Sequence, residues 1–265
     1  MRVYLEGVGL LGPGLNGWEA SRALLAGTAA YAATPTIVTA SDLLPAAERR
    51  RTGLPVKLAL AAGRAAFVHA GRDAATTATV FASSSGDGET LDHICATLAT
   101  AEREISPTRF HNSVHNAPAG YWSIATRSHA PSTSLCRHDA SFAAGLLDAA
   151  AQITVDGIPV ALLAYDQPYP GPLHAVRPVS ASFGVALVMT PQATGTAFAT
   201  LDIDFMCGAA GATRLTDDGL EAVRADVPAA RCLPLLAALA RGATEVVVLA
   251  YGAETHLRVA VAPWQ

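Results

Sequence analysis

Two hydrophobic patterns alternate along this chain. Short, continuous apolar runs, such as residues 159–165, are typical of strands that are buried on both faces of a sheet. Longer segments repeat their apolar residues every three or four positions, which is typical of helices. The first pattern predicts strands at residues 3–9, 79–83, 132–135, 159–165, 181–190, 195–205, 245–250 and 257–262, and the second predicts helices at residues 18–26, 57–70, 89–100, 119–126, 140–153 and 229–240.

Glycine and proline mark the boundaries between these segments. Gly12, Pro13 and Gly14 end the first strand, and Gly27 stops the first helix. The stretch 105–118 carries no periodic pattern and is predicted to be a long loop. Because helices alternate with fully apolar strands, we expect an α/β layered fold in which helices cover both faces of the sheet, with no clear domain break.

Composition adds an expectation about surfaces. Of the 265 residues, 51% are hydrophobic and only 15% are charged, and the mean hydropathy is +0.31. The chain is large enough to bury a sizeable core. So much apolar character with so little charge also predicts that a partner covers part of the surface.

Charge and cysteine content exclude several classes. A net charge of -4 argues against nucleic acid, and the one basic cluster, Arg49–Arg51, is typical of a solvated helix end. No apolar run has the length of a membrane span. Met1 leads directly into a strand pattern rather than a signal peptide. The four cysteines show no C-x-x-C spacing, so we expect free thiols in the cytoplasm.

A glycine-rich turn at Gly86–Gly88 separates a predicted strand from a predicted helix. Such a turn can bind phosphate. Here it lacks both the P-loop lysine and a complete G-x-G-x-x-G pattern. We therefore favour a tight structural turn, and keep a ligand site of an unrelated α/β enzyme as an alternative.

Histidines and one cysteine cluster between residues 111 and 139. Four of the eight histidines lie there, together with Cys136 and Asp139. Zinc needs three or four converging ligands, which this spacing does not predict. We expect no metal and no cofactor. An active Cys136–His138 pair remains an alternative, because alternate residues of a strand point to the same side.

Several segments together resemble one enzyme family. Gly7-Val-Gly9 followed by Trp18, the alanine-rich stretch 56–62, the loop with Pro107 and Asn116, then Pro131-Ser132, and Ser182-Phe-Gly-Val-Ala-Leu-Val-Met occur in the family's order. They resemble the N-terminal part of β-ketoacyl synthases, a branch of the thiolase fold. The resemblance implies a ketosynthase-like N-terminal half at residues 1–190. Residues 191–265 would be a reduced C-terminal half, packed into the same domain.

The register of this resemblance places a carboxylate where the family has its nucleophile. In the family the catalytic cysteine lies eight residues beyond the proline that corresponds to Pro131. Here that position is Asp139, and Cys136 comes three residues too early. A carboxylate is a poor nucleophile towards a thioester, and an activated thiolate is what the family's reaction needs. We favour a helix-capping role for Asp139.

The family's two catalytic histidine motifs are also missing. After Thr190 the chain contains one histidine, His256, in neither motif. We therefore expect no catalytic residue and no independent enzyme activity. The resemblance further implies that Leu91 and Ile94 line an acyl tunnel, and that Arg109 and Phe110 lie at the tunnel or a dimer interface.

Ketosynthase relatives without the cysteine are chain-length factors. The short form is similar to subunits of aryl polyene clusters, which pair with an active ketosynthase. The resemblance thus implies a heterodimer with a β-ketoacyl-ACP synthase, to which acyl carrier protein binds through the complex. The alternatives left open are an acyltransferase that uses Cys136 with His138, and the unrelated α/β enzyme with a site at Gly86–Gly88.

Overall fold

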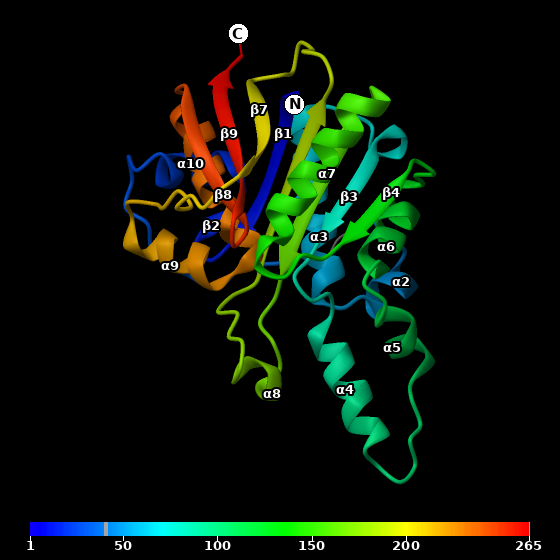
Figure 1. The fold of residues 1–265 in the computed structure, drawn as a ribbon. Helices are drawn as coiled ribbons and strands as arrows, with labels where there is room; N and C mark the ends of the chain where they lie inside the picture. The colour runs from blue at the N-terminus through cyan, green and yellow to red at the C-terminus, as the bar shows by residue number, and fades with distance from the viewer. Residues whose placement is uncertain (40–41, 265) are drawn as a thin grey trace.

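One mixed sheet organises the chain (Figure 1). A computed structural model describes residues 1–39 and 42–264. The strands follow the order β4-β3-β5-β6-β1-β7-β9-β8, with β2 paired to β1. Their bounds are β1 Arg2–Gly12, β2 Leu15–Asn16, β3 Ala78–Ala82, β4 Ser132–Leu135, β5 Val160–Asp166, β6 Phe183–Thr190, β7 Ala199–Cys207, β8 Glu245–Gly252 and β9 Thr255–Pro263.

Helices pack on both faces of this sheet, as the alternation of patterns predicts. The helices are α1 Trp18–Leu25, α2 Ala46–Arg51, α3 Leu54–Ala70, α4 Gly88–Leu98, α5 Pro107–Asn112, α6 Ala117–Thr126, α7 Ser141–Asp156, α8 Gly171–His174, α9 Asp218–Asp226 and α10 Leu233–Arg241, with short 3-10 turns η1 Ala74–Thr76, η2 His138–Ala140 and η3 Pro228–Cys232. The arginines of α2 lie in its last turn, and none of its residues is buried, so the predicted solvated helix end is confirmed.

Two apolar cores lie on opposite faces of the central strands. On β5, Leu162 belongs to the core beneath α7, whereas the next residue, Leu163, belongs to the core beneath α3 and α6. This division follows from the alternation of side chains along a strand. Gly7 and Gly9 of β1 lie directly against the α3 backbone, where any Cβ atom would collide with it. The close packing of α3 on β1 therefore requires the two glycines.

The last third of the chain extends the same sheet. Strand β7 pairs antiparallel with β1, with Leu201 opposite Val3. Strands β9 and β8 follow, and α10 packs against both of them. The sheet therefore runs without interruption from the first residues of the chain to the last strands.

Three parts of the secondary structure differ from the sequence-based prediction. The supposed long loop contains helix α5, and α6 begins at Ala117, two residues earlier than predicted. Pro107 and Pro118 had been interpreted as loop boundaries, but each lies in the first turn of a helix, where no N–H donor is needed. Helix α9 was not predicted, and β7 starts only at Ala199.

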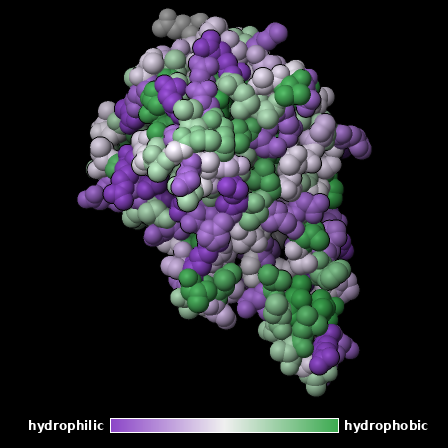
Figure 2. All heavy atoms as spheres, viewed as in Figure 1, coloured by the Kyte–Doolittle hydropathy of each residue, from purple (hydrophilic) through white to green (hydrophobic). Residues whose placement is uncertain are grey.

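Two arms extend beyond one end of the sheet. One is formed by α4 and α5, and the other by the loop that carries α8 (Figure 1). Apolar side chains gather on both arms in the space-filling view (Figure 2). They include Leu91, Leu98, Phe110, Leu173 and Val176, which are all exposed. Within the described residues, no helix combines the length and the apolar character that crossing a membrane requires.

Candidate functional site

The carboxyl ends of three parallel strands meet at one edge of the sheet. Strands β4 and β5 both run parallel to β3. Beyond their ends lie Ser83 and Ser84 after β3, Cys136 after β4, and Asp166 as the last residue of β5. In α/β folds the carboxyl ends of parallel strands are the usual place for a functional site. The polar residues of this chain gather there.

Asp166 is the buried centre of this edge. Its side chain is 3% exposed. One oxygen accepts hydrogen bonds from the Ser84 amide at 2.8 Å and the Ser84 hydroxyl at 2.7 Å, and the other accepts from the Ala229 amide at 2.8 Å. Burial raises the pKa of Asp166 to about 6, although these hydrogen bonds favour its ionised form. At neutral pH it is an ionised acceptor that ties β5 to the β3 loop and to η3.

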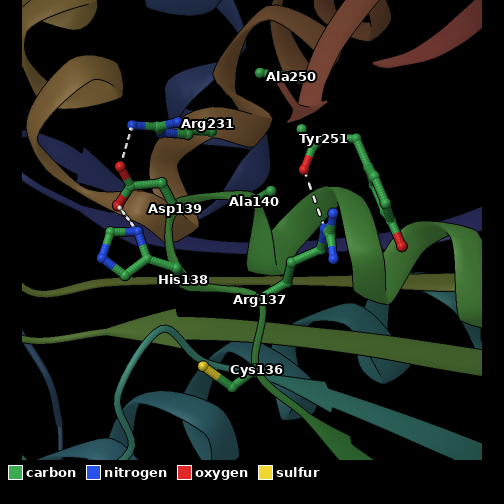
Figure 3. Close-up of a pocket in the computed structure, with 9 residues that line it drawn as sticks. Cys136, Arg137, His138, Asp139, Ala140, Arg231, Ala250 and Tyr251 are labelled. Atoms are coloured by element: carbon green, nitrogen blue, oxygen red, sulfur yellow. Dashed lines mark hydrogen bonds and ion pairs between the residues drawn. The ribbon is translucent and has the colours of Figure 1, made fainter. Parts of the chain in front are cut away.

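Asp139 lies just before α7 and forms ion pairs with two arginines, Arg177 and Arg231. Figure 3 shows the pair with Arg231. Its Oδ1 atom is 2.6 Å from Nη2 of Arg177, and its Oδ2 atom is 3.0 Å from Nη2 of Arg231. Burial acts to raise the pKa of Asp139, but the hydrogen bond from Arg177 and the charges of both arginines outweigh it and lower that pKa. The residue is therefore a carboxylate held in ion pairs.

The expected capping role of Asp139 is wrong. Its oxygens bind the two guanidinium groups, and no side chain caps the first amides of α7. The Ser141 hydroxyl instead accepts from the Arg137 amide at 2.9 Å. Both oxygens of Asp139 are taken by positively charged donors, and attraction between two full charges outweighs that of a carboxylate for a neutral backbone amide.

A polar chain connects the two carboxylates. The Tyr169 hydroxyl lies 3.2 Å from the Ser84 hydroxyl, and it accepts a hydrogen bond from Arg177 Nη1 at 2.5 Å. Arg177 then reaches Asp139, while Ser84 reaches Asp166. The network therefore joins the ends of β3 and β5, the α8 loop and the start of α7.

Cys136 and His138 are not brought together. The Cys136 thiol donates to the Ser84 carbonyl at 3.2 Å. The His138 ring instead faces Asp139, with Nδ1 3.4 Å from Oδ1. Cys136 lies well below the Asp139–Arg231 pair in Figure 3. The two side chains would point to the same side only if both residues belonged to one strand. Strand β4 ends at Leu135, and His138 lies in η2 with a left-handed φ of 48°.

The backbone and side chains of the turn at Gly86–Gly88 form hydrogen bonds with neighbouring residues of the chain. The Gly86 amide donates to the Ser83 hydroxyl at 3.0 Å, and Asp87 caps α4 by accepting from the Thr90 amide at 3.0 Å. A negatively charged cap takes the position that a phosphate would need. This geometry is that of the tight turn favoured from the sequence.

The four expected tunnel or interface residues all lie on the α4–α5 arm. Ile94 is buried, and Arg109 is half-buried. Leu91 and Phe110 are 54% and 65% exposed. Of the large aromatics near this arm, Tyr121 and Trp122 are buried, whereas Phe110 is exposed.

The clustered histidines do not converge. His111 packs its ring against Tyr121, His115 lies 3.3 Å from the Ser83 carbonyl, and His138 faces Asp139. Among residues 1–39 and 42–264, no three histidine, cysteine or acidic side chains form a group that could hold a metal ion.

Three residues of the polar network were not singled out from the sequence. The sequence gives one indication that Asp166 is important, since it is the only charged residue of a very apolar strand. It gives no indication for Arg177 and Arg231, because they are 38 and 92 positions away from the aspartate that they bind. Pairing over such separations depends on the fold.

The folds of known ketosynthase complexes are similar to this one. A chain of the ketosynthase (ApeO) in complex with its chain length factor (ApeC) from Xenorhabdus doucetiae is 23% identical, with a TM-score of 0.74 over 98% of this chain and 99% of that one. The ishigamide ketosynthase/chain length factor gives 14% identity and a TM-score of 0.72, covering 100% of both chains.

A third structure has the same fold at lower identity. It is AntDE:AntF, a type II PKS acyl-carrier protein in complex with its ketosynthase, with 10% identity, a TM-score of 0.74 and 99% coverage of both chains. At these identities the likeness establishes the thiolase-like fold. No protein of curated function matches the chain.

A family model decides the membership. The model for the β-ketoacyl synthase N-terminal domain matches residues 18–254, which is most of the chain. The match extends well past Thr190, into the strands that the sequence comparison had treated as a reduced second half. The chain therefore belongs to the β-ketoacyl synthase, N-terminal domain family, in a form shorter than a full ketosynthase.

Proposed function

We propose that this chain is a non-catalytic, chain-length-factor subunit that pairs with an active β-ketoacyl-ACP synthase. The observation that carries the proposal is the state of Asp139 at the position expected for the nucleophile. Two arginines bind its oxygens at 2.6 and 3.0 Å. A carboxylate held in this way is a weak nucleophile, and it is too acidic to act as a base at neutral pH.

The neighbouring groups do not replace the lost thiolate. The Cys136 thiol donates a hydrogen bond to a backbone carbonyl, and no imidazole of the described residues bonds to it. His256, the one histidine near the end of the chain, lies on β9, and its Nδ1 is 3.1 Å from the Gly208 carbonyl oxygen. A condensing enzyme needs an activated thiol next to its base. In our proposal the partner subunit supplies both.

The exposed apolar arm supports the pairing. Phe110, Val114 and Ile124 are each more than half exposed, and with His111 they border a depression of about 500 Å³. Clustered apolar side chains of this kind are typical of a protein interface.

The edge strand β4 adds a second contact surface. Its Pro131 and Leu135 carbonyls face β3, where they accept from the Thr79 and Ser83 amides. The backbone groups of Ser132 and Ser134 therefore point outwards, since successive residues of a strand alternate. An unpaired edge of this kind can pair with a strand of the ketosynthase.

The likeness to chains crystallised as ketosynthase–chain length factor pairs also supports the proposal. We place the pair in aryl polyene biosynthesis in the cytoplasm, with acyl carrier protein bound through the complex. Ile94 and Arg109 would then line the acyl tunnel, with Leu91 and Phe110 at its border. The four cysteines are all free, which suits a reducing compartment.

Reconstitution tests the proposal. The chain would be purified alone and together with its candidate ketosynthase partner, and malonyl condensation on acyl carrier protein would be measured. We expect the lone chain to be inactive, the pair to be active, and Cys136→Ala in this chain to leave the pair's rate unchanged. Condensation by the lone chain that Cys136→Ala abolishes would establish the acyltransferase alternative instead.

A control variant separates tunnel effects from loss of pairing. Ile94→Phe fills space beside the buried face of α4, and it should shorten the products of the pair without changing its stoichiometry. Val155→Phe, on the exposed side of α7, should leave product length unchanged. An unaltered product distribution in the Ile94 variant would contradict the tunnel assignment.

A further inference from the structure

An open pocket of about 560 Å³ lies directly beside Asp139. It is built from three separate segments of the chain, namely the residues that follow β4, the 3-10 turn η3, and the end of β8 (Figure 3). The polar side chains on its wall are those of Arg137, His138, Asp139, Arg231 and Tyr251. The proposed function uses Asp139 as evidence of a lost nucleophile and assigns no ligand to this pocket.

Positive charge exceeds negative charge at this pocket. Arg137 and Arg231 line it, and Arg177 reaches Asp139 from the α8 loop. Asp139 is the one carboxylate on the wall, and it is shared between two of the three arginines. The Asp166 carboxylate lies further along the network and is already bound by two backbone amides and the Ser84 hydroxyl.

Arg137 is held in place without an acidic partner. Its Nε donates to the Tyr251 carbonyl at 3.0 Å, and its guanidinium carbon lies 4.1 Å from the centre of the Tyr251 ring. Among the described residues, no carboxylate pairs with it. The stacking fixes the plane of the guanidinium group and leaves its terminal nitrogens able to bind an anion.

Arg231 also has unused donor capacity. Its Nη2 binds Asp139, while its Nε is shielded from solvent and has no partner among the described residues. A shielded donor without an acceptor is unfavourable. Because Nε is shielded, a ligand in the pocket would meet the terminal nitrogens of Arg231, of which Nη2 binds Asp139 and Nη1 has no hydrogen bond or ion pair among the described residues.

We propose that this pocket binds a phosphate group, with Arg137 and Arg231 as its two principal ligands. A phosphate monoester presents three terminal oxygens and up to two negative charges, so it can bridge two guanidinium groups that come from different elements. A carboxylate offers two oxygens and one charge, and so matches the excess of arginine less well. Asp139 is then a positioning residue for Arg231.

The phosphate can belong to a free phosphorylated small molecule or to the phosphodiester of a prosthetic arm on a partner protein. Both present the same oxygens to the arginines. They differ in charge, because a monoester is a dianion near neutral pH and a diester is a monoanion. The pocket is formed by this chain alone, so its binding test does not depend on the proposed heterodimer.

Calorimetric titration of the full chain at constant ionic strength tests the proposal, with inorganic phosphate, methyl phosphate, dimethyl phosphate and acetate as probes. We expect saturable binding of inorganic phosphate, weakened about tenfold by Arg137→Gln or by Arg231→Gln. Arg22→Gln, on the exposed face of α1, is the matched control and should bind like the unaltered chain. Thermal melts would verify that each variant is folded.

The four probes distinguish a free phosphate monoester from the phosphodiester of a prosthetic arm, and they can also contradict the proposal. Binding of methyl phosphate alone assigns the site to a free monoester, while equal binding of dimethyl phosphate assigns it to a prosthetic arm. If Arg231→Gln fails to fold, Arg137→Gln decides, because Arg137 takes part in no ion pair of the described residues. Absence of saturable binding, binding unaffected by Arg137→Gln, or acetate binding as tight as that of phosphate would each overturn the proposal.

Discussion

At the scale of single residues, the two carboxylates at this edge of the sheet are held by hydrogen bonds and ion pairs. Asp139 has both oxygens bound to arginines, and Asp166 is bound to backbone amides. Each carboxylate acts as an acceptor that joins elements far apart in the sequence. Neither is left free to attack a substrate.

The buried carboxylate predicts a particular pH dependence of stability. Because the pKa of Asp166 is raised to about 6 in the folded chain, the folded state binds this proton more tightly than the unfolded state. Binding of this proton stabilises the folded chain. That stabilisation is fully present below the pKa of Asp166 in the unfolded chain, and it is lost as the pH rises through about 6.

Asp166→Asn removes this titration. We expect the difference in unfolding free energy between the unaltered chain and Asp166→Asn to shift by about 2 kcal/mol between pH 4 and pH 7, in favour of the unaltered chain at the lower pH. Urea denaturation across this range measures it. A difference that stays constant with pH would show that Asp166 titrates as it does in water.

Restoring a thiol should not restore catalysis. Asp139→Cys places a cysteine where the family has its nucleophile, but the nearest imidazole, His138, lies on the exposed surface, and the family's histidine motifs are absent. We expect no condensation by the lone variant in a malonyl-release assay, with Asp139→Ser as the control. Turnover by Asp139→Cys alone would mean that the chain still contains a working base.

At the scale of elements, the α4–α5 arm departs from the packing of the remaining helices. Helix α3 buries most of its length against the sheet, whereas α4 buries only Gly88, Thr90 and Ile94. Exposed apolar side chains on the arm are costly in water unless a partner covers them. The exposed apolar side chains of the α4–α5 arm thus account for part of the high apolar content of the sequence (Figure 2).

A charge on this arm should prevent pairing without unfolding the chain. Phe110→Glu changes a side chain that is 65% exposed, so the free energy of unfolding should stay within about 0.5 kcal/mol. We expect its affinity for the ketosynthase to fall at least about thirtyfold, because a desolvated charge is costly in an interface. Analytical ultracentrifugation measures this, with Val155→Glu on α7 as the control. Equal affinity of the two variants would place the interface elsewhere.

At the scale of the whole molecule, one continuous sheet unites the chain. Strand β1 lies between β6 and β7, so the first strand needs partners from both the middle and the end of the sequence. The apolar core beneath α7 likewise draws side chains from β1, β5 and α10. This arrangement favours a single cooperative unit.

Removing the last strands should therefore unfold the remainder. A chain of residues 1–192 loses β7 beside β1 and the Ala229 amide that binds Asp166. We expect one cooperative thermal transition for the full chain and none for the shortened chain, followed by circular dichroism. A shortened chain that melts cooperatively would show that residues 1–190 form an independent domain.

The sequence by itself determined the periodic parts of this protein. Strand β5 and helices α3 and α7 were predictable because burial imposes a period of two or 3.6 residues that depends only on near neighbours. The prediction of a lost nucleophile also needs only the sequence, since it is a count along the chain from Pro131 to Asp139. Helix α5 was missed because a proline was interpreted as a break and not as a first turn.

Only the tertiary structure decided what surrounds Asp139. Arg177 and Arg231 reach it from positions 38 and 92 residues later, and Tyr251 arrives from β8 to hold Arg137 against the same pocket. No local sequence pattern predicts these contacts. The side chains are far apart in the sequence and become neighbours only when the strands pair and the cores pack. In our proposal Asp139 stands where the family has its cysteine, and the fold pairs it with two arginines beside a pocket.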